Sequence, residues 1–175
     1  MARDSYRSRV YAAERKAFEA EYVWRKDHYV SVPNGIGGRR MESVEEIQAY
    51  VNKLIASAWF KRRWPHTHAC KILPGKGCRR AIAFSGLYDR IEMPRWSRVE
   101  WVVLHEMAHI VSPDGEKHGR WFLAAYIELV THMLGKTAGL SLKAQLHIAK
   151  VPVTIRKGKQ APFKVRLARA AMERG

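Results

Sequence analysis

The eleven residues from Trp101 to Val111 constrain the fold of this chain more than any other stretch. They read WVVLHEMAHIV, and His105, Glu106 and His109 are the only polar side chains among them. A helix that is apolar on nearly every face is a buried helix, so this stretch predicts a helix in the protein interior. Three polar groups without partners there would cost several kcal/mol. One shared metal ion and its water would satisfy all three together.

These three residues have HExxH spacing. Residues four apart lie one turn apart on the same face of a helix, so His105 and His109 can reach one metal ion. Glu106 leaves the helix about 100° away from His105 and can reach a water on that metal without being a ligand. Two histidine ligands and a carboxylate base are typical of zinc hydrolases. The alternative is that the three are core residues hydrogen-bonded to other groups.

A third metal ligand is expected downstream, because a catalytic zinc ion usually has three protein ligands and one open position. Pro113 predicts a turn that ends the first helix. His118 then stands at the start of a second apolar helix, predicted over residues 119–134. If that helix folds back on the first, His118 reaches the metal. Glu128 is the alternative ligand, because thermolysin-like enzymes permit its spacing from His109.

The segments HEMAH at 105–109 and HGRWF at 118–122 resemble the SprT/Spartan group of zinc metallopeptidases. That group follows HExxH with a third histidine in an HGxxF-type element opening the next helix. Residues 67–134 also resemble uncharacterised metallohydrolases of actinobacteria and their phages. The zinc-ribbon appendage of the SprT/Spartan group has no counterpart here. The resemblance implies a zincin-like fold and a single zinc ion, with His105, His109 and His118 as ligands and Glu106 as the base.

The resemblance implies a peptidase whose substrates are proteins on DNA. Our first hypothesis is therefore a zinc-dependent hydrolase with a protein substrate. In it, Glu106 takes a proton from the attacking water and passes it to the leaving amine. The second hypothesis is a nucleic-acid-binding or ribosome-binding protein with a zincin scaffold and little or no turnover. The third is a zinc-dependent nuclease. An intact Glu106 argues against the second, because a scaffold without turnover has no use for a base.

The charge of the chain favours polyanionic partners. It has 32 Lys and Arg against 16 Asp and Glu, a formal net charge of +16. Such an excess favours DNA, RNA, the ribosome or an acidic membrane surface. Residues 150–175 carry eight basic side chains and one acidic one. They are either a solvated tail or a nucleic-acid-binding arm. The candidate contacts in this tail are Arg156, Lys157, Lys159, Lys164, Arg166 and Arg169.

A chain of 175 residues suits one domain with extensions. We expect an N-terminal helix and glycine-rich connector over residues 1–42, a zincin-like domain over 43–149 and the basic tail over 150–175. No apolar run is long enough to span a membrane, and no apolar leader follows the first residues. We therefore expect a cytoplasmic protein without a membrane partner. Cys70 and Cys78 are expected to be free thiols in that reducing compartment.

The expected fold class is α+β, with helices before and after a small sheet. Apolar residues at helical spacing predict a helix from Arg9 to about His28. A capping box, Ser43-Val-Glu-Glu46, predicts a second helix that runs to about Trp59. Another, Ser97-Arg-Val-Glu100, predicts the start of the HExxH helix. After a break over residues 136–139, a short helix is expected from Ser141 to about Ala149.

The strands are expected just before the HExxH helix, which is the order of a zincin. Residues 68–73 and 79–84 are predicted to form a hairpin around a Pro-Gly-Lys-Gly turn, placing Cys70 opposite Cys78. Residues 87–93 are predicted as a further strand. An edge strand beside such a site can hold an extended peptide by backbone pairing.

Overall fold

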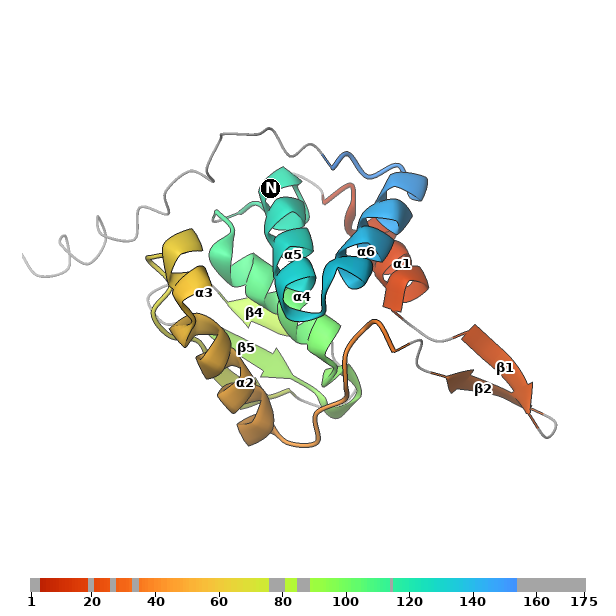
Figure 1. Cartoon of the computed structure of the whole chain (residues 1–175), viewed down its shortest axis with the longest axis horizontal. Helices are drawn as coiled ribbons and strands as arrows, with labels where there is room; N and C mark the ends of the chain where they lie inside the picture. The colour runs from red at the N-terminus through yellow and green to blue at the C-terminus, as the bar shows by residue number, and fades with distance from the viewer. Residues whose placement is uncertain are drawn as a thin grey trace, which may run out of the picture.

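Figure 1 shows the computed structural model, which describes residues 4–18, 21–25, 28–32, 35–75, 81–84, 89–113 and 115–153. Within these ranges the protein is α+β, as predicted, with six α-helices, a two-stranded hairpin and a three-stranded mixed sheet. The helices are α1 (Arg7–Phe18), α2 (Val44–Ala56), α3 (Ala58–Arg63), α4 (Glu100–Val111), α5 (Arg120–Met133) and α6 (Lys136–Ile148). The strands are β1 (Glu21–Arg25), β2 (His28–Val32), β3 (Lys71–Pro74), β4 (Ile82–Phe84) and β5 (Arg90–Met93), and a short 3-10 helix, η1, spans Arg95–Ser97.

The three-stranded sheet has the order β3-β5-β4, with β3 parallel and β4 antiparallel to β5. The predicted hairpin between residues 68–73 and 79–84 is therefore wrong, because β5 lies between these two segments. Ile91 and Met93 of β5 are fully buried, and the central position gives this strand two partners. Cys70 is buried. Cys78, and with it the predicted juxtaposition, lies outside the described residues.

The N-terminal helix is shorter than predicted. α1 ends at Phe18, and the segment expected to continue it forms β1, which pairs antiparallel with β2. Aromatic and β-branched residues favour strands over helices, and β1 contains three of them in succession, Tyr22, Val23 and Trp24. In Figure 1 this hairpin lies apart from the three-stranded sheet.

Two serines set the boundaries of α2 and α3. The Ser43 hydroxyl accepts a hydrogen bond from the Glu46 amide at 3.1 Å, so the first predicted capping box is confirmed. The helix was expected to continue to about Trp59 but ends at Ala56. Ser57 interrupts it by accepting from the Phe60 amide at 3.2 Å, which caps α3.

The later helices pack in series: α4 against β4 and α5, α5 against α6, and α6 against α1. α4 begins at Glu100, but its predicted capping box is wrong. Ser97 lies in η1 and donates to the Pro94 carbonyl, and the helix has no side-chain cap. None of the helices in the described ranges is long and apolar enough to cross a bilayer.

The predicted break over residues 136–139 is also wrong, because α6 starts directly after Gly135, whose φ is 95°. Gly139 instead allows α5 and α6 to approach each other. A Cβ there would lie 2.0 Å from the Thr131 hydroxyl oxygen. In contrast, the predicted second helix over residues 119–134 is confirmed as α5.

Candidate metal centre

The structure brings His105, His109 and His118 together. His105 and His109 lie one turn apart on α4, and their ring centroids are 5.0 Å apart. His118 approaches from the loop before α5, with its ring centroid 4.8 Å from that of His109. One nitrogen of each imidazole lies within 4.8 Å of the others. The three residues are close enough to bind one metal ion, as the sequence predicted.

The loop between α4 and α5 holds His118 in place through local contacts. Gly115 and Lys117 both have positive φ, 77° and 52°, which reverses the chain. The Glu116 carboxylate then accepts a hydrogen bond from the Trp121 amide at 2.9 Å, in the first turn of α5. A Cβ on Gly119 would lie 2.4 Å from that carboxylate. The glycine after His118 therefore leaves room for the Glu116 side chain in this position.

Phe122 supports all three imidazoles. Its ring centroid lies 4.9 Å from that of His105, 4.3 Å from that of His109 and 4.8 Å from that of His118. The ring is fully buried. The HGxxF segment thus has a physical explanation: a histidine at the cluster, a glycine that leaves room for the Glu116 side chain, and an apolar ring beneath the histidines.

Two carboxylates from the N-terminal segment contact the histidines, and sequence reasoning missed both. Glu14 of α1 is hydrogen-bonded to Nδ1 of His105. Asp4 is bonded to Nδ1 of His118 at 2.6 Å. The two Nε2 atoms of these histidines lie 3.3 Å apart. Because the carboxylates take the Nδ1 atoms, both Nε2 atoms face one shared space.

The electrostatics of the cluster suit a cation. Burial lowers the pKa of His105 to about 3 and also lowers the pKa of His118, so both rings are neutral near pH 7 and have a lone pair for a metal. Burial raises the pKa of Glu14 and of Glu106 to about 8. Within the described ranges neither carboxyl forms an ion pair with a lysine or arginine. A divalent cation on the histidines would supply the missing positive charge, so these residues fit a metal ion.

Glu106 is buried between the histidines and the sheet. It accepts a hydrogen bond from the backbone of Ala83 in β4, and the nearby Glu14 adds to burial in raising its pKa. A cavity of about 240 Å³ adjoins it. The residues lining this cavity are Tyr11, Glu14, Arg15, Ala81, Trp96, Trp101, Val102, His105 and Glu106. Small molecules or side chains that enter it therefore meet Glu106 and one histidine of the cluster.

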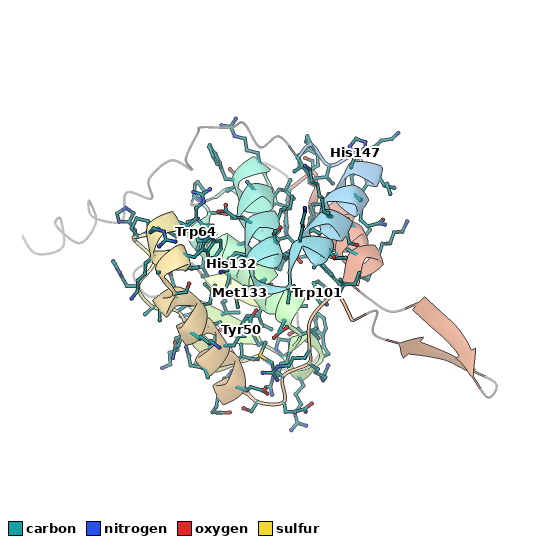
Figure 2. All side chains as sticks on the ribbon, in the orientation of Figure 1. Tyr50, Trp64, Trp101, His132, Met133 and His147 are labelled. Carbon is teal, nitrogen blue, oxygen red and sulfur yellow. The ribbon has the colours of Figure 1, made fainter. Side chains whose placement is uncertain are left out.

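Glu128, the alternative third ligand, is engaged elsewhere. The Nε–H of Arg63 donates to its two carboxylate oxygens at 2.8 and 2.9 Å, which ties α3 to α5. Beside this pair, the ring of His132 stacks on Trp59 with centroids 3.8 Å apart. Figure 2 shows His132 next to Trp64 where the two helices meet. The histidine cluster and the Arg63–Glu128 pair are thus separate groups of polar residues.

The six basic residues expected to contact nucleic acid, from Arg156 to Arg169, lie outside the described residues. We found no significant match of the chain to a protein-family model, a curated protein or a solved structure.

Proposed function

We propose that this protein is a zinc-dependent metallohydrolase, a SprT-like peptidase that acts on proteins associated with nucleic acid. The observation that carries the proposal is the cluster of His105, His109 and His118, whose nitrogen atoms lie within 4.8 Å of one another. Three imidazoles are a typical ligand set of catalytic zinc. A carboxylate directly after the first ligand supports hydrolysis rather than a purely structural metal site.

In this proposal the three histidines would hold the ion. A zinc ion bound there would act as a Lewis acid that polarises a carbonyl group and lowers the pKa of water. Glu106 takes the proton of the attacking water and passes it to the leaving amine. Its position supports both steps, because its carboxyl group lines the cavity beside His105, where it can reach an attacking water and a leaving group.

Tyr11 is a further candidate that sequence reasoning missed. Its ring centroid lies 5.5 Å from that of His105 and 5.3 Å from that of His118, and it lines the cavity. Burial raises the pKa of its hydroxyl, which stays protonated at neutral pH. We propose it as a hydrogen-bond donor to the carbonyl oxygen during hydrolysis.

Two features support a protein substrate. In the described part of the three-stranded sheet, β4 lies at the edge, and an edge strand can pair with an extended peptide. Its Ala83 also contacts Glu106, so a peptide on β4 would lie close to the base.

The net charge of +16 supports association with nucleic acid, and the basic residues after Val153 are the first candidates for that contact.

The test compares substrates on one zinc-loaded preparation of the full chain. Unfolded casein, a DNA-bound protein, single-stranded DNA and RNA are each incubated with wild type, Glu106→Gln and Glu128→Gln. We expect cleavage of protein by wild type and Glu128→Gln, and little by Glu106→Gln. Cleavage of DNA or RNA instead would favour the nuclease. A zinc-bound wild type that cleaves none of the four would favour the scaffold without turnover.

A further inference from the structure

We propose that Glu14 and Asp4 are positioning residues of the metal centre, so that the N-terminal segment is part of the metal site. Glu14 precedes its partner His105 by 91 residues, and Asp4 precedes its partner His118 by 114. Two carboxylates from one short segment therefore reach two of the three histidines. The inference rests on the proposed metal site but not on hydrolysis.

The geometry assigns both carboxylates the same task. Each lies against the Nδ1 atom of its histidine, and the two Nε2 atoms lie 3.3 Å apart. A carboxylate that accepts a hydrogen from Nδ1 fixes the imidazole tautomer and leaves the lone pair on Nε2 for the metal. It also limits rotation of the ring and makes Nε2 a stronger donor. Glu14 does this for His105, and Asp4 for His118.

The surroundings of Glu14 argue against a purely structural role. Its side chain is fully buried on the face of α1 that carries Val10, Ala13 and Ala17. The hydroxyl of Tyr126 donates a hydrogen bond to it. Burying a carboxylate costs free energy unless charge and hydrogen bonds compensate for it. A neutral side chain would therefore serve the packing of α1 at least as well, and the carboxylate is explained by a cation on the histidines.

Asp4 contacts His118 in the same way, but its side chain is less buried. Its side chain is 18% exposed, against 2% for Glu14, so water screens its charge more. Its hydrogen bond to His118 is nevertheless short, at 2.6 Å, and a bond to an ionised carboxylate is stronger than one between neutral groups. We therefore expect Asp4 to contribute less to metal affinity than Glu14.

The test uses Glu14→Gln and Asp4→Asn, which keep the size of each side chain and remove its charge. Glu128→Gln is the matched control, because it makes the same change at the Arg63 pair, outside the histidine cluster. Zinc affinity is measured by competition with a chromophoric chelator. Absorption spectra of the cobalt-loaded proteins report ligand geometry. Melting temperatures are recorded with and without zinc.

We expect Glu14→Gln to weaken zinc binding by about 10- to 100-fold, as is typical for partners of metal-ligating histidines. Asp4→Asn should weaken it measurably, by up to about 10-fold, and Glu128→Gln should leave it unchanged. The melting temperature of metal-free Glu14→Gln should equal or exceed that of the metal-free wild type. A purely structural role predicts the reverse, namely a lower metal-free melting temperature with unchanged zinc affinity.

The outcomes separate this inference from the proposed function. Wild type that binds neither zinc nor cobalt overturns both. Wild type that binds zinc, with affinity and cobalt spectrum unchanged in both Glu14→Gln and Asp4→Asn, overturns the positioning role alone. If Glu14→Gln does not fold, Asp4→Asn decides, because the partial exposure of Asp4 makes that change mild for the fold. Unchanged affinity in Asp4→Asn then counts against the proposal.

Discussion

Two carboxylates of similar chemistry have opposite surroundings in this protein. Glu128 on α5 is about a third exposed and has its own cation, the guanidinium of Arg63. Glu14 on α1 is fully buried and contacts His105, a ring whose pKa burial lowers to about 3. The first pair is complete and ties two helices together. The second lacks a permanent positive charge, which a metal ion on the histidine cluster would supply.

The largest effect is expected from variants that break the histidine cluster and leave the Arg63–Glu128 ion pair intact. His105→Ala and His109→Ala should abolish zinc binding and the stabilisation by zinc, because metal binding energy is partly folding energy. His118→Ala should weaken zinc strongly, whereas Glu128→Gln should keep the zinc content of wild type. Elemental analysis and melting curves measure both properties. Normal zinc in His118→Ala, with zinc lost in Glu128→Gln, would reverse the assignment of the third ligand.

The second prediction removes the base and leaves the ligands in place. Glu106→Gln should lower hydrolysis by at least about 10²-fold, the loss typical of a general base. Zinc content should stay near that of wild type, because Glu106 is not among the three grouped ligands. Initial rates on the best substrate of wild type give the measurement. Full activity with normal zinc in this variant would mean that Glu106 is not the base.

The third prediction concerns the pH dependence of stability that the buried Glu106 carboxyl group causes when no cation is bound. Burial raises the pKa of Glu106 from 4.5 to about 8, so between these pH values the folded state holds a proton here that the unfolded state has lost. The free energy of unfolding of metal-free wild type therefore falls as pH rises through this window, by up to about 1.4 kcal/mol per pH unit from this group. Metal-free Glu106→Gln lacks this contribution.

Denaturant titrations of the two metal-free proteins at pH 5, 6.5 and 8 measure the difference between them. The free energy of unfolding of Glu106→Gln should increase relative to that of wild type as the pH rises. Zinc should weaken the pH dependence of the free energy of unfolding of wild type, because a nearby cation favours the ionised carboxylate. If the free energies of unfolding of the two metal-free proteins depend on pH in the same way, the pKa of Glu106 is not raised by burial.

The smallest effect is expected at the ion pair. Arg63 and Glu128 are each about a third exposed, and exposed pairs contribute about 1 kcal/mol or less. Glu128→Gln should therefore lower the free energy of unfolding by no more than this, with equal cost in the metal-free and zinc-loaded proteins. A cost that depends on zinc would link the two sites and weaken the contrast between them.

The features that could be predicted from the sequence are those that lie within one or two adjacent elements. His105 and His109 belong to one helix turn, and helical geometry alone brings them together. His118 follows after one short loop, so its arrival at the cluster needed only that α5 fold back on α4.

The features that could not be predicted depend on packing between distant segments. The insertion of β5 between β3 and β4 depends on burial across the whole sheet, so the local turn signal around Pro74 favoured the wrong partner. Asp4 gives no sequence signal for its contact with His118. Glu14 does give one, because it interrupts the apolar face formed by Val10, Ala13 and Ala17. A charged residue on a buried helical face needs a partner, and the sequence does not identify that partner.

Anomalous diffraction at the zinc edge from crystals of the zinc-loaded full chain tests the central claim most directly. We predict one strong peak bounded by His105, His109 and His118, with zinc–nitrogen distances of about 2.0–2.1 Å. Glu106 should lie close to the ion without coordinating it, and Glu128 should remain with Arg63. A peak coordinated by Glu128 or by a cysteine, or no peak at the three histidines, would contradict the account.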